Sequence, residues 1–186
     1  MDTKNKVAVI YKSKYGSTKK YAGWIAIKLD ADLYELSDII DKDLKKYETI
    51  VYGSYLHRGK IKGLNFITKN YDKIKDKNII IFTVGLSKCS DKTIEKVADD
   101  NFDKEILKNI RLFYLKGAFD YNNLTFVDKL ISKGFKTSLE GKSYNELDKW
   151  NKEFLKNFYS PMDFTNKKSV TQIVELISSL ESNKNT

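Results

Sequence analysis

Short apolar runs alternate with stretches whose apolar positions recur every three or four residues along most of the chain. The first pattern is typical of buried strands and the second of amphipathic helices. We predict strands at residues 6–11, 32–36, 48–54, 78–84 and 110–119. Helices are predicted between them at 18–29, 64–71 and 92–109, the last with a break near residue 100. This alternation indicates an α/β fold, in which helices cover both faces of a parallel sheet.

The pattern changes after residue 119, where apolar and aromatic residues keep helical spacing without an intervening strand. Leu124, Val127 and Leu130 form one such series, and Trp150 and Phe154 belong to another. We predict a helical insertion at about residues 122–160 and a C-terminal helix at about 166–181. Because no repeat, low-complexity tract or linker divides the chain, residues 1–186 are predicted to form a single domain.

Three of the predicted strands are followed by segments rich in glycine and hydroxyl groups. The carboxyl ends of neighbouring parallel strands meet at one edge of a sheet, where ligands of open α/β sheets bind. We therefore expect the three segments to converge on one site, although each alone could be an ordinary turn or helix cap. They are Ser13, Lys14, Tyr15, Gly16, Ser17 and Thr18; Gly53, Ser54, Tyr55, Leu56, His57, Arg58 and Gly59; and Thr83, Val84, Gly85 and Leu86.

The first segment has the chemistry of a phosphate site. It joins a buried strand to a helix N-terminus, where backbone N–H groups and the helix dipole favour an anion. No Gly-x-x-x-x-Gly-Lys-Ser/Thr motif of nucleoside triphosphatases is present, and the Gly-x-Gly-x-x-Gly motif of dinucleotide sites is absent too. Receiver domains need acidic residues where this chain has Lys12, Ser13 and Ser54. A mononucleotide monophosphate is the ligand that remains.

The motif Ser13-x-x-Gly16-x-Thr18 behind a buried strand resembles the phosphate loop of the flavodoxin-like family. The resemblance covers about residues 6–119 and resumes in the last helix. It implies a three-layer α/β sandwich with a five-stranded parallel sheet in the order 2-1-3-4-5 and FMN as the cofactor. Residues 53–59 and 115–121 are most similar to the flavodoxin-domain group that contains quinone-dependent protoporphyrinogen oxidases.

The resemblance also implies roles for the three segments. The hydroxyl groups of Ser13, Ser17 and Thr18 would hold the FMN phosphate together with backbone N–H groups of residues 14–18. Residues 55–59 would line one side of the flavin ring, with Tyr55 or His57 stacked on it, and residues 83–86 would meet its pyrimidine edge. His57 and Arg58 are the candidate catalytic residues, although a lone histidine in a loop is often only a surface residue.

Charge and composition limit the remaining possibilities. The formal net charge is +9, but 32 of the 34 basic residues are lysines, and lysines occur in every segment. Nucleic-acid sites favour clustered arginines, so we predict a solvated lysine surface and no nucleic-acid partner. The single cysteine, Cys89, and the single histidine exclude a Cys or His metal cluster, and no metal is predicted. No apolar run reaches the ~20 residues that span a bilayer, which predicts a cytoplasmic protein.

Three functions remain open from the sequence. The first is an FMN-dependent oxidoreductase that acts on a quinone or a porphyrinogen-type substrate. The second is a basic electron-transfer flavodoxin that serves a protein partner, and the third is a flavodoxin-fold domain without a cofactor. NAD(P)H, a quinone and an electron-transfer protein are all candidate redox partners. An aromatic-rich insertion suits a substrate-binding role, which favours the first function.

Overall fold

The computed structural model describes residues 6–39 and 44–182, which form two compact units. The first unit runs to Gly117 and resumes at Thr165, and the second comprises Ala118–Phe164. The elements of the first unit are β1 (Val7–Lys12), α1 (Ser17–Leu29), β2 (Asp32–Glu35), α2 (Leu36–Ile39), η1 (Leu44–Lys46), β3 (Thr49–His57), β4 (Lys60–Ile61), α3 (Asn65–Ile74), β5 (Asn78–Gly85), α4 (Asp91–Asn101), α5 (Lys104–Asn109), β6 (Ile110–Lys116), η4 (Lys167–Val170) and α8 (Thr171–Ser182).

Five parallel strands form the sheet of the first unit in the order β2-β1-β3-β5-β6. Counted along the chain, this is the predicted order 2-1-3-4-5, so the α/β fold class of the flavodoxin-like family is confirmed. The order reverses direction between β1 and β3, because the chain goes outward to β2 and then crosses back past β1. The short strand β4, which was not predicted, adds an antiparallel partner to β3.

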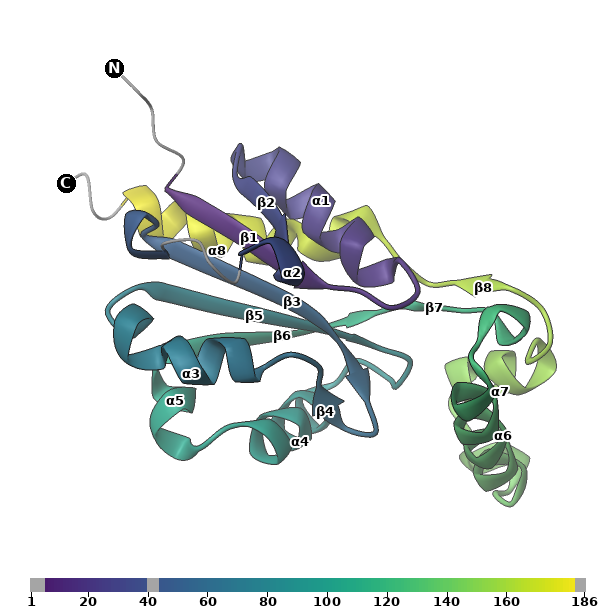
Figure 1. Cartoon of the computed structure of the whole chain (residues 1–186). Helices are drawn as coiled ribbons and strands as arrows, with labels where there is room; N and C mark the ends of the chain where they lie inside the picture. The colour runs from purple at the N-terminus through teal and green to yellow at the C-terminus, as the bar shows by residue number, and fades with distance from the viewer. Residues whose placement is uncertain (1–5, 40–43, 183–186) are drawn as a thin grey trace. The chain divides into compact units, whose positions relative to one another are not determined.

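Helices cover both faces of this sheet, with α1 and α8 on one side and α3, α4 and α5 on the other (Figure 1). Side chains alternate between the two cores along each strand, as the pleat requires. Val7 and Val9 of β1 face the core under α1 and α8, whereas Ala8 and Ile10 face the opposite core. Because both faces are buried, the central strands are apolar almost throughout, and that is why the sequence shows them clearly.

Two predicted strand boundaries are wrong. The strand predicted to end at Ser54 continues to His57, because residues beyond the sheet edge pair with β4 and form a hairpin. The strand predicted over residues 110–119 ends at Lys116, because Lys116 pairs with Gly85, the last residue of β5. Gly117 closes that end, since its N–H donates to the carbonyl of Gly85 at 2.9 Å.

The second unit contains mainly helices, at the place where the helical insertion was predicted. Its elements are β7 (Ala118–Phe119), η2 (Tyr121–Asn123), α6 (Phe126–Glu140), η3 (Tyr144–Glu146), α7 (Lys149–Lys156) and β8 (Met162–Asp163). Its core is aromatic: Phe154 and Phe158 are buried, and the Phe119 ring lies 5.0 Å from Phe154 and 5.4 Å from Phe158 between centroids. These aromatic residues at helical spacing therefore pack with one another.

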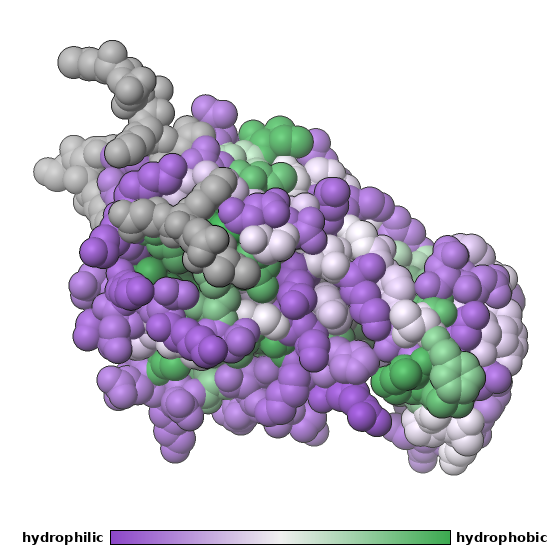
Figure 2. All heavy atoms as spheres, viewed as in Figure 1, coloured by the Kyte–Doolittle hydropathy of each residue, from purple (hydrophilic) through white to green (hydrophobic). Residues whose placement is uncertain are grey.

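The N-terminal half of α6 leaves part of its apolar surface uncovered. Phe126, Val127 and Leu130 are 77%, 57% and 56% exposed. Figure 2 shows this region of the second unit as a hydrophobic area in a largely hydrophilic surface. No helix in residues 6–39 or 44–182 is both long and apolar enough to cross a bilayer.

Candidate functional site

The first predicted segment forms a tight loop between β1 and α1. The N–H of Gly16 donates to Ser13 Oγ at 3.1 Å, which closes the loop. Gly16 has φ = 92°, in the left-handed region that L-residues with a Cβ disfavour. An added Cβ would meet no atom within 4 Å, so glycine is required here by the backbone conformation and not by lack of space.

The loop leads directly into α1, and the N-cap residue of this helix provides no side-chain cap. Gly16 is the N-cap residue, and the first turn of α1 contains no acidic residue. In α4, α6 and α7, Ser90, Thr125 and Asp148 accept a hydrogen bond from the first turn, whereas α3 and α5, like α1, have no side-chain cap. Backbone N–H groups at the start of a helix need an acceptor, and the helix dipole favours a negative one. Ser17 and the buried Thr18, the first two residues of α1, both carry hydroxyl groups. The arrangement fits a phosphate group.

The second segment begins inside the sheet. Gly53 lies beside Tyr11 of β1, and a Cβ on Gly53 would come within 2.0 Å of Cζ of Phe82. This glycine therefore makes room for the Phe82 ring in the core. Ser54 is fully buried, and its hydroxyl donates to the carbonyl of Lys62 at 2.6 Å. Gly53 and Ser54 therefore have packing and hydrogen-bonding roles within β3, just before its C-terminal end.

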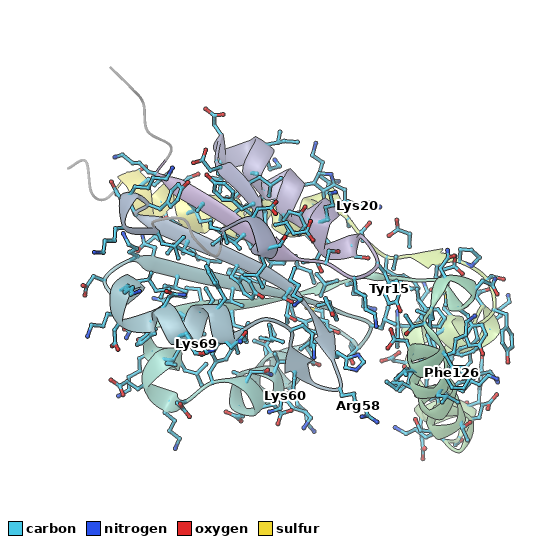
Figure 3. The ribbon with its side chains drawn as sticks, in the orientation of Figure 1. Tyr15, Lys20, Arg58, Lys60, Lys69 and Phe126 are labelled. Atoms are coloured by element: carbon cyan, nitrogen blue, oxygen red, sulfur yellow. The ribbon has the colours of Figure 1, made fainter. Side chains whose placement is uncertain are left out.

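The rest of the second segment forms the β3–β4 hairpin. Leu56 pairs with Ile61 and His57 with Lys60, and the two central residues Arg58 and Gly59 have φ = 54° and 78°. Positive φ at both positions is the signature of the two-residue turn that suits the twist of a hairpin. Figure 3 shows Arg58 at the tip, with its side chain extended away from the ribbon.

Asn101 at the end of α4 fixes this hairpin. Its Oδ1 accepts from the N–H of Ile61 at 2.8 Å, and its Nδ2 donates to the carbonyl of Gly59 at 2.8 Å. The ammonium group of Lys60 also donates to the backbone carbonyl of Asp100. The hairpin that carries His57 and Arg58 is therefore held against α4.

The third segment ends β5, within a row of polar side chains that crosses four strands. Lys12, Ser54, Thr83 and Tyr114 are successive register partners on β1, β3, β5 and β6. Thr83 is fully buried, and its Oγ1 has no hydrogen-bond partner among the residues that the structure describes. Such a group is costly in a core, so its place at the ligand-binding edge of the sheet suits a bound water molecule or ligand.

Two buried tyrosines support this edge. Tyr114 OH accepts from the N–H of Ser87 at 2.8 Å, and Tyr52 OH donates to the carbonyl of Lys62 at 2.7 Å. Burial raises the pKa of Tyr114 to about 12 and raises the pKa of Tyr52 as well. Both side chains stay neutral at physiological pH and act as fixed hydrogen-bonding partners for the loops that follow β4 and β5.

The structure brings the first segment and the ends of β3 and β5 to one edge of the sheet, as predicted. It holds the tip of the second segment, Arg58 and Gly59, at the end of α4 instead. The pairing Tyr55↔Val84 places the last residues of β3 beside those of β5. Whether any of these side chains contacts a cofactor stays a prediction.

Several residues at this edge were not among the predicted site residues. A Cβ on Gly117 would lie 3.6 Å from Ser17 Oγ and 3.0 Å from Val84, so the end of β6 borders the first loop. Tyr21 OH donates to the carbonyl of Lys116 at 2.8 Å and accepts from the N–H of Asn166 at 3.2 Å. A glycine directly after a buried strand was the signal that could have identified Gly117.

Cys89 and the acidic residues form no metal-binding group in the part of the chain that the structure describes. Cys89 is exposed, and its thiol lies 3.5 Å from the carbonyl of Tyr114, to which it donates. Within the described part of the chain, no group of three or more His, Cys, Asp or Glu side chains is arranged to hold a metal ion.

The chain is similar to several solved structures. The oxidised flavodoxin 2 of Bacillus cereus is 19% identical, with 60% of this chain and 85% of that chain covered and a TM-score of 0.40. The Trp repressor binding protein of Bacillus subtilis is 16% identical, with 60% and 83% covered and a TM-score of 0.45. A flavodoxin, WrbA-like protein of Agrobacterium tumefaciens is 17% identical, with 57% and 80% covered and a TM-score of 0.39.

No curated protein matched the sequence. A family model does match: the model described as flavodoxin domain covers residues 8–145, which is most of the chain and includes all three predicted segments. The chain belongs to the flavodoxin domain family.

Proposed function

We propose that this protein binds FMN at the loop between β1 and α1 and works as a flavoprotein oxidoreductase. The observation that carries the proposal is the uncapped N-terminus of α1 behind a left-handed Gly16, at the edge of the sheet where β3 and β5 also end. Membership of the flavodoxin domain family supports FMN as the phosphate-bearing ligand.

The first loop would hold the phosphate. The N–H groups of the first turn of α1 and the hydroxyl groups of Ser17 and Thr18 supply donors, and no acidic side chain lies in that turn. Ser13 contributes differently, because its Oγ already accepts from Gly16 N–H and thereby keeps the loop folded. Tyr55 near the end of β3 and residues 83–86 at the end of β5 would line the flavin ring. FMN, when bound, supplies the redox chemistry, and the protein supplies position and charge.

His57 and Arg58 would act through charge. A cation near a bound flavin favours its more negative, reduced state and so raises its reduction potential. Arg58 lies at the hairpin tip that Asn101 holds at the end of α4, so its guanidinium would act on a bound flavin through its charge at a distance and not by direct contact. A higher potential suits oxidation of an organic substrate, whereas a carrier that delivers electrons at low potential would keep cations away from the flavin.

A quinone or a porphyrinogen-type compound is the substrate class that we propose. Such molecules have large apolar ring or chain surfaces, and the second unit by itself exposes apolar Phe126, Val127 and Leu130. Electron transfer to a protein partner is the second candidate function, favoured by the excess of lysines. Steady-state assays with quinones, protoporphyrinogen and NAD(P)H separate the two, since a pure carrier turns over none of these alone.

The phosphate site is tested by comparing FMN with riboflavin, which lacks the phosphate. We expect the purified apoprotein to bind FMN at least about tenfold more tightly than riboflavin. Gly16→Ala should lower FMN affinity by about tenfold, because an alanine costs roughly 1–2 kcal/mol in the left-handed region. Riboflavin affinity should change less. Fluorescence titration of each flavin measures both constants.

Gly23→Ala is the matched control, because Gly23 lies within α1 and an added Cβ there meets no atom within 4 Å. It should leave both affinities unchanged. Equal affinities of the wild-type protein for FMN and riboflavin would exclude a phosphate site at this loop. A protein that binds neither flavin would be the fold without its cofactor.

A further inference from the structure

The excess positive charge of the chain comes from two short segments. Residues 12–29 contain five lysines and residues 165–174 contain two, and neither segment contains an aspartate or glutamate. Since these seven belong to the 34 basic residues, the remainder of the chain has 27 basic and 25 acidic residues. Lysines occur throughout the sequence, but elsewhere carboxylates nearly balance them. The two segments hold +7 of the net charge of +9.

The fold places these two segments side by side in the first unit. Lys20 Nζ donates to Thr165 Oγ1 at 3.2 Å, and the N–H of Asn166 donates to Tyr21 OH at 3.2 Å. Ile25 of α1 and Ile173 of α8 share one core. Figure 1 shows α1 and α8 on the same side of the sheet. The exposed lysines of both segments define one surface, which consists of Lys14, Lys19, Lys20, Lys28, Lys167 and Lys168. It is called the α1–α8 surface because η4, which carries Lys167 and Lys168, leads directly into α8; α8 itself contains no lysine.

This surface begins at the candidate phosphate loop. Lys14 belongs to that loop, and Lys19 and Lys20 lie in the first turns of the helix that follows it. Tyr15 in the loop is 43% exposed and Ile27 further along α1 is 76% exposed, so apolar groups lie among the lysines. Figure 3 labels Tyr15 and Lys20 at this end of α1. Apolar groups combined with a charged rim are typical of surfaces that bind proteins.

The composition of the surface favours an acidic protein over a nucleic acid. All six of its cations are lysines, and the two arginines of the chain, Arg58 and Arg111, lie on other elements. Nucleic-acid sites rely on arginine for bidentate contacts to phosphates and bases. A field of lysines gives long-range attraction without such geometry, which speeds the encounter of oppositely charged proteins.

We propose that the α1–α8 surface is the docking site of an acidic electron-transfer protein. The redox character of that partner rests on the proposed function, because a protein seated here lies next to the candidate FMN loop. The docking itself rests only on the charge and position of the six lysines.

Two variants of equal net charge test the proposal. The surface variant replaces Lys19, Lys28, Lys167 and Lys168 by glutamine. The control variant replaces four exposed lysines of other elements, Lys69, Lys73, Lys92 and Lys104, by glutamine. Each variant lowers the charge from +9 to +5. Each also removes one lysine from the last turn of an α-helix, Lys28 or Lys73. Any difference between them therefore reports where the charge lies.

The probe is an acidic plant-type [2Fe–2S] ferredoxin carrying a fluorescent label, with basic cytochrome c as a negative probe. Anisotropy titrations are done with and without FMN at about 0.01 M and about 1 M salt, where the screening length is about 30 Å and about 3 Å. We expect binding of ferredoxin at low salt and its loss at high salt. The surface variant should bind about tenfold more weakly than wild type, and the control variant within about twofold.

Absence of ferredoxin binding at low salt, or an equal loss in both variants, would overturn the proposal. A short DNA duplex and phosphatidylglycerol vesicles are titrated in parallel. Tighter binding of either one, lost in the surface variant alone, would assign the surface to a nucleic acid or a membrane and also overturn it. The titrations without FMN keep the two proposals separate: a protein that binds ferredoxin but no FMN contradicts only the proposed function.

Discussion

At the scale of single residues, Gly53 was predicted to belong to a flavin-binding segment, but packing in the core explains why a glycine stands there. The sequence placed this glycine in a flavin-binding segment. In the structure it lies in the sheet, where the Phe82 ring occupies the space that a side chain would need. Phe82 in turn packs edge-on to Tyr21 of α1, with ring centroids 6.5 Å apart. The glycine therefore supports the contact between sheet and helix.

Gly53→Ala should accordingly destabilise the protein. The added Cβ would lie 2.0 Å from Cζ of Phe82, so the ring or the strand must move. We expect the free energy of unfolding to fall by about 3 kcal/mol, at the upper end for overpacked cores. Urea denaturation followed by circular dichroism measures it. Gly23→Ala, with no atom within 4 Å, should instead raise stability by about 0.5–1 kcal/mol. Unchanged stability of Gly53→Ala would show that Phe82 rearranges freely.

Other residue-scale features were accessible from the sequence. Gly16 was predicted to lie in a loop between an apolar strand and a helix, and the structure places it there in a left-handed conformation. The polar row of Lys12, Ser54, Thr83 and Tyr114 was not predicted as a unit. Its members come from four strands, so only the strand order and register bring them into line.

At the scale of elements, the β3–β4 hairpin is the main departure from expectation. The strand was predicted to end at Ser54, with residues 55–59 in a loop that lines the flavin, but residues 55–61 form a two-residue turn and a short antiparallel pair. The sequence Arg58-Gly59 carries only half of the usual turn signal, since the first position is not Gly, Asn or Asp. Hydrogen bonds from Asn101, far away in the sequence, supply the remaining support.

Replacing Asn101 by alanine should loosen this hairpin specifically. The N–H of Ile61 and the carbonyl of Gly59 would both lose their partner, at a cost of about 1–3 kcal/mol. Hydrogen exchange at the Ile61 amide should become faster, while exchange within β5 changes only as much as global stability does. NMR-detected exchange measures each amide separately.

Asn70→Ala is the matched control, because the Asn70 side chain only donates to Phe66 within the same helix. It should leave the Ile61 amide as protected as in the wild-type protein. If Asn101→Ala also left that amide protected, the pairing with β3 alone would be enough to hold the hairpin.

At the scale of the whole molecule, the chain leaves the first unit at Gly117 and resumes it at Thr165. The second unit brings its own ends together, since Ala118 pairs with Asp163 and Phe119 with Met162. The last helix, α8, then completes the core of the first unit with Ile173 and Ile177. That residues 1–186 form a single flavodoxin-like domain with a helical insertion stays a prediction.

Replacing residues 118–164 by a short Gly-Ser linker should therefore leave the first unit folded. Each of its two cores is built from residues outside the excised segment. We expect a single cooperative urea transition and retained affinity for FMN. Deletion of α8 is the control, because it removes Ile173 and Ile177 from the core and should abolish the transition. Loss of folding on excision of 118–164 would mean that the two units depend on each other.

The strand order was implied by the resemblance to the flavodoxin-like family, and the sequence by itself determined the fold class and the loop that begins the candidate site. Those features follow from local patterns, because buried strands, amphipathic helices and a glycine before a helix each leave a signature within a few residues. Tertiary structure alone decided the features that join distant segments. It turned the second predicted loop into a hairpin fixed by Asn101, and it placed residues 12–29 beside residues 165–174. Packing of α1 against η4 and α8 on one face of the sheet is what combines the lysines of α1 with those of η4 into one surface.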